Sequence, residues 1–166
     1  TGFGMREDEQ RCLRAGFDGH LSKPLTQKRI SKAFDALHSW HLARGMRVLL
    51  VDDNQFVLAT VAATLRRIGV EVNTSLGGPD VFALASETKP QLLVLDLSLG
   101  HGRASGFDLA RQLRELPELS DSHFVALTGS DDPTLREKAG GLGFSDYLVK
   151  PLSVKEFLDL VRRLAN

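Results

Sequence analysis

The chain has 166 residues, of which 42% are hydrophobic, and it carries 21 basic and 21 acidic side chains. This length suits one ordinary domain with an additional segment. A net charge of zero gives no indication of nucleic acid or an anionic membrane surface as a partner. Cys12 is the only cysteine, which excludes an internal disulfide and fits a reducing compartment.

No apolar run approaches the roughly 20 residues needed to cross a bilayer, and the sequence does not begin with a signal-peptide pattern. We therefore expect no membrane segment here and a cytoplasmic location. Because the sequence begins at Thr1, we expect it to be a piece of a longer protein, and that parent protein can itself be membrane-bound.

Residues 46–166 alternate between short apolar runs and segments with helical periodicity. The apolar runs predict five strands, at residues 47–52, 70–75, 91–96, 123–128 and 146–149. Helices are predicted between and after them from faces of apolar residues, one of which joins Leu109, Leu113 and Leu116. Strand–helix alternation with short connections predicts a parallel sheet covered by helices on both faces.

Polar side chains stand at the ends of four of these strands. Asp52 and Asp53 end the first, Asp96 the third, Thr128 the fourth, and Lys150 follows the fifth. The carboxyl ends of parallel strands meet at one edge, where such folds place their sites. Three carboxylates there repel one another unless a cation lies among them, and Mg²⁺ prefers oxygen ligands. A lysine and a hydroxyl nearby suit a phosphoryl group, with an aspartate as nucleophile.

Each of these residues has an ordinary structural interpretation when taken singly. An aspartate after a strand is often a helix cap, and a Lys-Pro pair is often an exposed turn. The conjunction of four strand ends, each with a suitable group, favours a functional site.

Residues 46–166 resemble the receiver domain of two-component response regulators through the segments "VLLVDDN", "LLVLD", "VALTG" and "DYLVKPL". The resemblance implies a flavodoxin-like, doubly wound five-stranded parallel sheet of order 2-1-3-4-5. It also implies that Asp96 is the phosphoacceptor, which receives a phosphoryl group from a histidine kinase or a histidine phosphotransfer domain. The domain would then be a signalling module that switches a protein-interaction surface, and not a turnover enzyme.

The same resemblance assigns the other site residues. By it, Mg²⁺ is held by Asp52, Asp53, Asp96 and the backbone carbonyl of Ser98. Thr128 is the switch hydroxyl, and Lys150 meets the phosphoryl group. Tyr147 matches an aromatic position whose ring moves on activation, and a cis peptide bond is expected between Lys150 and Pro151. The surface that switches would be formed by the fourth helix, fifth strand and fifth helix of the domain.

One segment departs from the family pattern. Many receivers have a proline four residues after the phosphoacceptor, where this sequence has Gly100, and a later glycine that corresponds here to Gly106. The loop "LSLGHGRASG" is therefore expected to be about two residues longer and more flexible.

Two other functions remain open for residues 46–166. One is a phosphatase or other hydrolase with an aspartate nucleophile on a similar sheet. Such enzymes typically need a second aspartate two residues after the nucleophile, where this chain has Ser98. The other is a degenerate receiver that acts only as a scaffold, which the complete set of site residues disfavours.

The first 45 residues repeat the end of the chain. Residues 1–39 align without a gap on residues 128–166, and "GHLSKPL" falls on "DYLVKPL". Ten positions are identical: Thr1, Gly2, Gly16, Phe17, Leu21, Lys23, Pro24, Leu25, Lys28 and Leu37. We interpret residues 1–45 as the last third of another receiver (fourth helix, fifth strand and fifth helix) followed by a linker. This predicts a parent protein with several receivers, such as a hybrid sensor histidine kinase.

The N-terminal segment lacks the carboxylates of a phosphorylation site and has an apolar helix face formed by Ile30, Ala33, Phe34 and Leu37. A single strand with its helices leaves apolar surface and an unpaired edge. We therefore expect receiver–receiver packing, either through residues 1–45 or through the face of the fourth helix, fifth strand and fifth helix.

Overall fold

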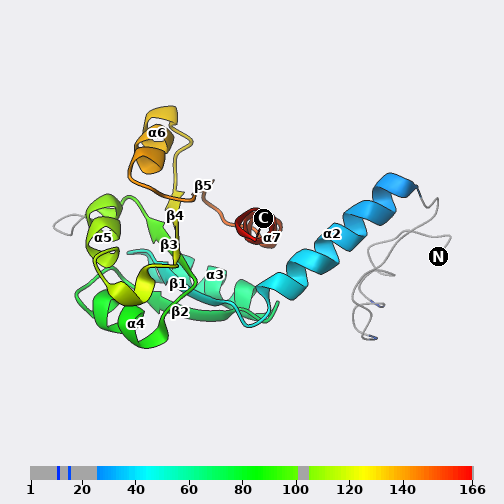
Figure 1. Ribbon diagram of the computed structural model, residues 1–166, viewed down its shortest axis with the longest axis horizontal. Helices are drawn as coiled ribbons and strands as arrows, with labels where there is room; N and C mark the ends of the chain where they lie inside the picture. Colours follow the sequence, from blue (N-terminus) through cyan, green and yellow to red (C-terminus); the bar gives the residue numbers. More distant parts are fainter. Residues whose placement is uncertain (1–10, 12–14, 16–25, 101–104, 166) are drawn as a thin grey trace. The chain divides into compact units, whose positions relative to one another are not determined.

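Figure 1 shows the computed structural model of the chain, which describes all residues except 1–10, 12–14, 16–25, 101–104 and 166. The chain divides into two compact units, Thr1–Leu42 and Ala43–Asn166.

The second unit is built on five parallel strands: β1 (Arg47–Val51), β2 (Glu71–Ser75), β3 (Leu92–Asp96), β4 (His123–Thr128) and β5 (Asp146–Val149). Their order across the sheet is β2-β1-β3-β4-β5, which confirms the predicted fold class. Each strand lies within one residue of its predicted bounds. Because Val51 pairs with both Ser75 and Leu95, the residues that follow β1 and the last residue of β3 reach the same edge.

Helices cover both faces of this sheet: α3 (Gln55–Arg66), α4 (Asp80–Thr88), α5 (Gly106–Leu113), α6 (Pro133–Gly141) and α7 (Val154–Leu164). In Figure 1, α4 and α5 lie on one side of the strands, with α3 and α7 on the other. The side chains of Asn54, Ser105, Asp132 and Ser153 accept backbone N–H bonds at helix starts, as N-caps do. Within the described ranges, no helix is both long and apolar enough to cross a membrane.

Alternate residues of each strand build the two cores. Leu49 and Leu93 belong to the cluster formed with α4, α5 and α6, and both are fully buried. Leu50 and Val94, the residues next to them in sequence, face α3 instead. Successive residues of a strand point to opposite faces, and here both faces are in apolar surroundings. This accounts for the continuous apolar runs in the sequence.

One helix ends earlier than its sequence pattern predicts. Leu116 was expected on the same helical face as Leu109 and Leu113, but α5 ends at Leu113. Leu116 is extended (φ −77°, ψ 120°) and precedes a 3₁₀ turn at Pro117–Leu119. The prediction was wrong because a residue before proline is disfavoured in the helical conformation. Leu116 still packs against the core from its position outside the helix.

The described part of the first unit is mainly helix α2 (Gln27–Ala43). Ile30 and Ala33, from the predicted apolar face, are half-buried. The other two residues of that face, Phe34 and Leu37, have side chains outside the description, and the strand expected around "GHLSKPL" lies outside the described residues. The loop "LSLGHGRASG", predicted to be about two residues longer and more flexible than in the family, includes residues 101–104, which lie outside the described residues.

Lys89, which ends α4, offers a test of backbone strain. It has a left-handed conformation (φ 44°, ψ 62°), and its carbonyl accepts a bond from Arg47 Nε at 3.0 Å. The left-handed conformation costs a residue with a Cβ about 1 kcal/mol of conformational free energy, and this cost is smaller for glycine. We expect Lys89→Gly to raise the free energy of unfolding by about 0.5 kcal/mol in urea titrations. Lys89→Ala, which keeps the Cβ, should give no gain, and a loss with glycine would contradict the argument.

Candidate functional site

The five polar residues predicted at the strand ends lie together at the carboxyl edge of the sheet. Asp96 is the last residue of β3 and Thr128 the last of β4. The backbone N–H of Asp52 donates to Ser75 at 3.2 Å, and that of Lys150 donates to Thr128 at 2.7 Å, which continues the sheet beyond the ends of β1 and β5. The parallel register therefore brings these side chains together.

Lys150 links two of the carboxylates. Its Nζ lies 2.8 Å from Asp96 Oδ2 and 2.5 Å from Asp52 Oδ2. Burial acts to lower the pKa of the Lys150 ammonium, but the close contacts with Asp52 and Asp96 outweigh it and raise the pKa above its ordinary value. Lys150 is thus held as a cation between two carboxylates that are almost completely buried.

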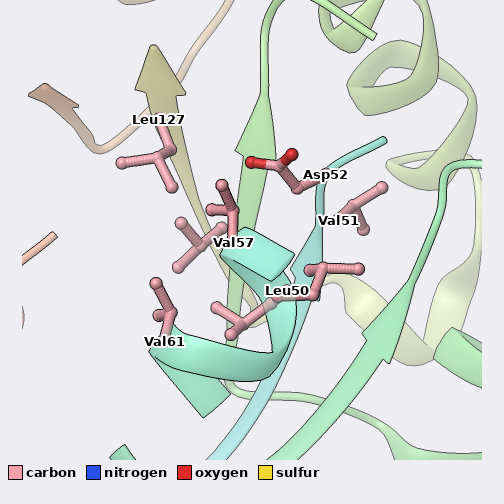
Figure 2. Close-up of a pocket in the computed structure, with 8 residues that line it drawn as sticks. Leu50, Val51, Asp52, Val57, Val61 and Leu127 are labelled. Carbon is pink, nitrogen blue, oxygen red and sulfur yellow. The ribbon is translucent and has the colours of Figure 1, made fainter. Parts of the chain in front are cut away.

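Asp52 borders apolar surroundings. Its side chain lies at the edge of a small cavity between the sheet and α3, where it is the only polar residue among the eight that line the space (Figure 2). Within the described residues, its Oδ2 accepts no hydrogen bond of good geometry, although Lys150 is its ion-pair partner. A buried carboxylate oxygen in such surroundings is costly unless further positive charge is nearby.

The three carboxylates fit a divalent cation. One oxygen from each of Asp52, Asp53 and Asp96 lies within 4.8 Å of the others. Oxygen ligands lie 2.0–2.6 Å from Mg²⁺ or Ca²⁺, so this spacing is compatible with one ion among the three carboxylates. Among the described residues, Lys150 is the one cation paired with this cluster. It balances one negative charge of three, which leaves a formal charge that a divalent ion would neutralise.

Asp53 is held by Gly100, the residue that stands where many receivers have a proline. The backbone N–H of Gly100 donates to Asp53 Oδ2 at 2.9 Å. A proline at this position has no N–H to donate. A Cβ at Gly100 would also lie 2.5 Å from the same oxygen, so the glycine allows the loop to approach the carboxylate. Sequence reasoning identified Gly100 only as a departure, because the contact spans 47 positions of the chain.

Ser98 lies in the loop that follows Asp96. Its backbone N–H donates to Asp96 Oδ1 at 3.0 Å, while its side chain is exposed. This bond orients the Asp96 carboxylate, whose other oxygen accepts from Lys150. The metal contact expected for the Ser98 carbonyl stays a prediction.

Thr128 and Tyr147 are connected through one loop residue. The N–H of Ser130 donates to Thr128 Oγ1 at 3.3 Å, and the Tyr147 hydroxyl donates to the Ser130 carbonyl at 2.7 Å. Both side chains are buried, with 2% and 5% of their surface exposed. Thr128 and Tyr147 are therefore linked through the backbone of Ser130. The Lys150–Pro151 peptide bond, which follows β5, is cis.

The sequence comparisons agree with this fold. The family model for the response regulator receiver domain matches residues 48–162. The chain therefore belongs to the receiver domain family of response regulators.

Individual relatives extend the comparison. The chain is 34% identical over 122 residues to the transcriptional regulatory protein GltR of Pseudomonas aeruginosa, covering 74% of this chain and 50% of that protein. The chain spans about half the length of several curated relatives that it matches.

Two solved structures are similar. One is a response regulator from Burkholderia pseudomallei with a phosphorylated aspartic acid, calcium ion and citrate, at 28% identity and a TM-score of 0.63, covering 70% of this chain and 66% of that one. The other is a CheY-like response regulator receiver domain from Methylobacillus flagellatus, at 28% identity and a TM-score of 0.64, covering 72% of this chain and 98% of that one.

Proposed function

We propose that residues 46–166 are a phosphoacceptor receiver of a two-component phosphorelay, in which Asp96 accepts a phosphoryl group. The observation that carries this proposal is the placement of Asp96 Oδ2 at 2.8 Å from the Lys150 ammonium, inside a cluster of three carboxylates. A structural ion pair needs one carboxylate and one cation, so the two additional carboxylates call for another role.

The proposed chemistry is the transfer of a phosphoryl group from a histidine nitrogen to a carboxylate oxygen. An oxygen of Asp96 attacks the phosphorus of a phosphohistidine on a kinase or phosphotransfer domain. The phosphorus–nitrogen bond breaks, an acyl phosphate forms on Asp96, and the leaving imidazole takes the electron pair and then a proton. Lys150, already within 2.8 Å of Asp96, would transfer its contact to a phosphoryl oxygen, and the Thr128 hydroxyl would bind another.

Mg²⁺ is the proposed ion, with Asp52, Asp53, Asp96 and the Ser98 carbonyl as its protein ligands. When bound it would neutralise charge on the phosphoryl oxygens. The phosphorylated aspartate and calcium ion named for the Burkholderia pseudomallei regulator support a hard divalent cation beside such a site. The oxygen donors of this cluster suit Mg²⁺ and Ca²⁺ alike.

The proposed output is a change of surface. The Thr128 hydroxyl accepts the Ser130 N–H, and rotation of this side chain to donate its O–H to a phosphoryl oxygen would disturb that contact and, through Ser130, the bond from Tyr147. Tyr147 lies on β5 next to α6. This proposal makes the α6–β5–α7 face the surface that partner proteins read in two states.

We also propose that residues 1–45 are the end of a preceding receiver, as in a hybrid histidine kinase or a multi-receiver protein. Helix α2 begins at Gln27 and α7 at Val154, a separation of 127 that equals the offset of the sequence repeat. Thr26 stands where Ser153 caps α7. The coincidence of helix start and preceding hydroxyl residue supports a common origin for the two segments.

The phosphoacceptor assignment is tested with a small phosphodonor such as acetyl phosphate. We expect the wild-type chain to gain one phosphoryl group in the presence of Mg²⁺, measured by intact mass, and Asp96→Asn to gain none. The amide keeps the shape of the side chain but is not a nucleophile. Omission of Mg²⁺ with added chelator should slow labelling about tenfold or more, since the charge of the carboxylates would then repel the donor.

Asp108→Asn is the matched control, because Asp108 is an exposed carboxylate in the first turn of α5 and does not belong to the cluster of Asp52, Asp53 and Asp96. It should label like the wild type. Labelling of Asp96→Asn to the wild-type extent would contradict the proposal.

A further inference from the structure

Three side-chain or backbone contacts hold Ser130 and Asp131 in the loop between β4 and α6. Ser130 donates its N–H to Thr128 and accepts the Tyr147 hydroxyl on its carbonyl. The next residue, Asp131, accepts a hydrogen bond from Arg136 Nη2 at 2.9 Å through Oδ1. The first two contacts belong to the proposed switch. The third comes from the first turns of α6 and has no part in the site itself.

Arg136 also covers the ring of Tyr147. Its Cζ lies 4.6 Å from the ring centroid, at a distance typical of a cation–π contact. The Arg136 side chain is 50% exposed, whereas Tyr147 is only 5% exposed. The guanidinium is thus the solvent-facing partner, and the ring lies beneath it.

The ring belongs to the buried core cluster, and a groove between α6 and β5 lies beside it, lined by Arg136, Ala139, Gly140, Phe144 and Asp146. On the α6 side of this groove Ala139 and Gly140 have small side chains or none, so Arg136 is the long α6 side chain that contacts the ring. The Tyr147 hydroxyl is fixed by one bond to Ser130, and Arg136 contacts the face. Besides the core packing, these two contacts hold the hydroxyl and one face of the ring.

We propose that Arg136 is a positioning residue that clamps the Tyr147 ring in its buried position and ties it to the β4–α6 loop through Asp131. The balance between the buried and exposed positions of the ring then depends on Arg136 as well as on events at Asp96. A role of this clamp in signalling rests on the proposed switch role of Tyr147. The clamp itself acts in the unphosphorylated chain.

The experiment uses the fact that the whole sequence contains a single tyrosine. Nitration by tetranitromethane, followed by mass spectrometry of the Tyr147 peptide, reports how often this one ring is exposed. Without phosphodonor, we expect Arg136→Ala to raise the nitration rate about five- to tenfold. Arg136→Lys should raise it about twofold, since a lysine keeps a charge over the ring but not the planar stacking. Asp131→Asn, which weakens the anchor alone, should raise it by about as much as Arg136→Lys.

Lys138→Ala is the matched control. Lys138 lies on the same helix and makes the same kind of contact, with its Nζ 4.4 Å from the centroid of Phe107. It should leave the nitration rate of Tyr147 unchanged. Melting curves under the same conditions would show that global unfolding does not produce the difference.

Two results would overturn the clamp: wild-type nitration in Arg136→Ala, or an equal rise in Lys138→Ala. If Arg136→Ala does not fold, Asp131→Asn decides the question, and wild-type nitration in that variant counts against the proposal. Because all rates are read without phosphodonor, failure of Asp96 to be phosphorylated would not affect this test.

Discussion

Gly106→Ala is expected to lower the free energy of unfolding by about 3 kcal/mol, the upper end of what overpacking costs. A Cβ at this position would lie 2.8 Å from Leu97 Cα and closer still to the carbonyl oxygen of Asp96. Both are backbone atoms next to the site, so no flexible side chain can move aside. Either the start of α5 or the end of β3 must shift.

The same substitution tests whether the position of Asp96 depends on this close approach. The N–H of Gly106 also bonds to the Leu97 carbonyl at 3.3 Å, so displacement of α5 would disturb the loop that carries Ser98. We expect slower labelling by acetyl phosphate along with a melting temperature lower by roughly 10 °C. Urea titration and thermal melting measure the two stability values.

Gly140→Ala provides the control, because a Cβ at Gly140, inside α6, would meet no atom within 4 Å. Alanine in a helix interior is favoured over glycine by roughly 0.5–1 kcal/mol, so this variant should equal or exceed the wild type in stability. If Gly106→Ala were as stable as the wild type, the close approach at Asp96 would be unimportant for the fold.

Lys150→Met is the second change with a large expected effect. It removes the cation paired with Asp52 and Asp96, both nearly fully buried. Breaking a buried pair costs 3–5 kcal/mol, but the Lys150 side chain is 23% exposed and solvent screens part of its charge. We therefore expect the free energy of unfolding to fall by about 2 kcal/mol, measured by urea titration in a chelator solution without divalent ions.

Mg²⁺ should restore part of that loss, because an ion bound to the folded state alone stabilises it by mass action. The gain on adding Mg²⁺ should be larger for Lys150→Met than for the wild type, since Lys150 is the cation that pairs with the cluster among the described residues. Labelling by acetyl phosphate should remain low even when Mg²⁺ has restored the fold, if Lys150 contacts the phosphoryl group.

Lys155→Met is a suitable comparison because Lys155 pairs with Asp159 on the exposed side of α7, with 75% of its side chain exposed. Exposed pairs of this kind contribute about 0.3–0.5 kcal/mol, and Mg²⁺ should make no difference to it. Equal stability of Lys150→Met and the wild type in chelator would show that the lysine does not compensate the buried carboxylates.

The sequence by itself determined the strands and the residues at their ends. A strand buried on both faces reads as a continuous apolar run, and the polar residue that follows marks its end. Since parallel strands end at a common edge, Asp52, Asp96 and Thr128 could be placed together before any distance was known. The end of α5 was harder to predict from the sequence. The apolar pattern through Leu116 is helical, whereas Pro117 disfavours the helical conformation at Leu116.

Contacts between distant residues were decided only by the tertiary structure. The bond from Gly100 to Asp53, the approach of Gly106 to the Asp96 carbonyl, and the cover of Arg136 over Tyr147 have no periodic signal in the sequence. Each depends on how a loop or helix start is placed against a strand end, with a tolerance below the size of one methyl group. Apolar periodicity sets which face of an element is buried, whereas such contacts require the final packing of the whole domain.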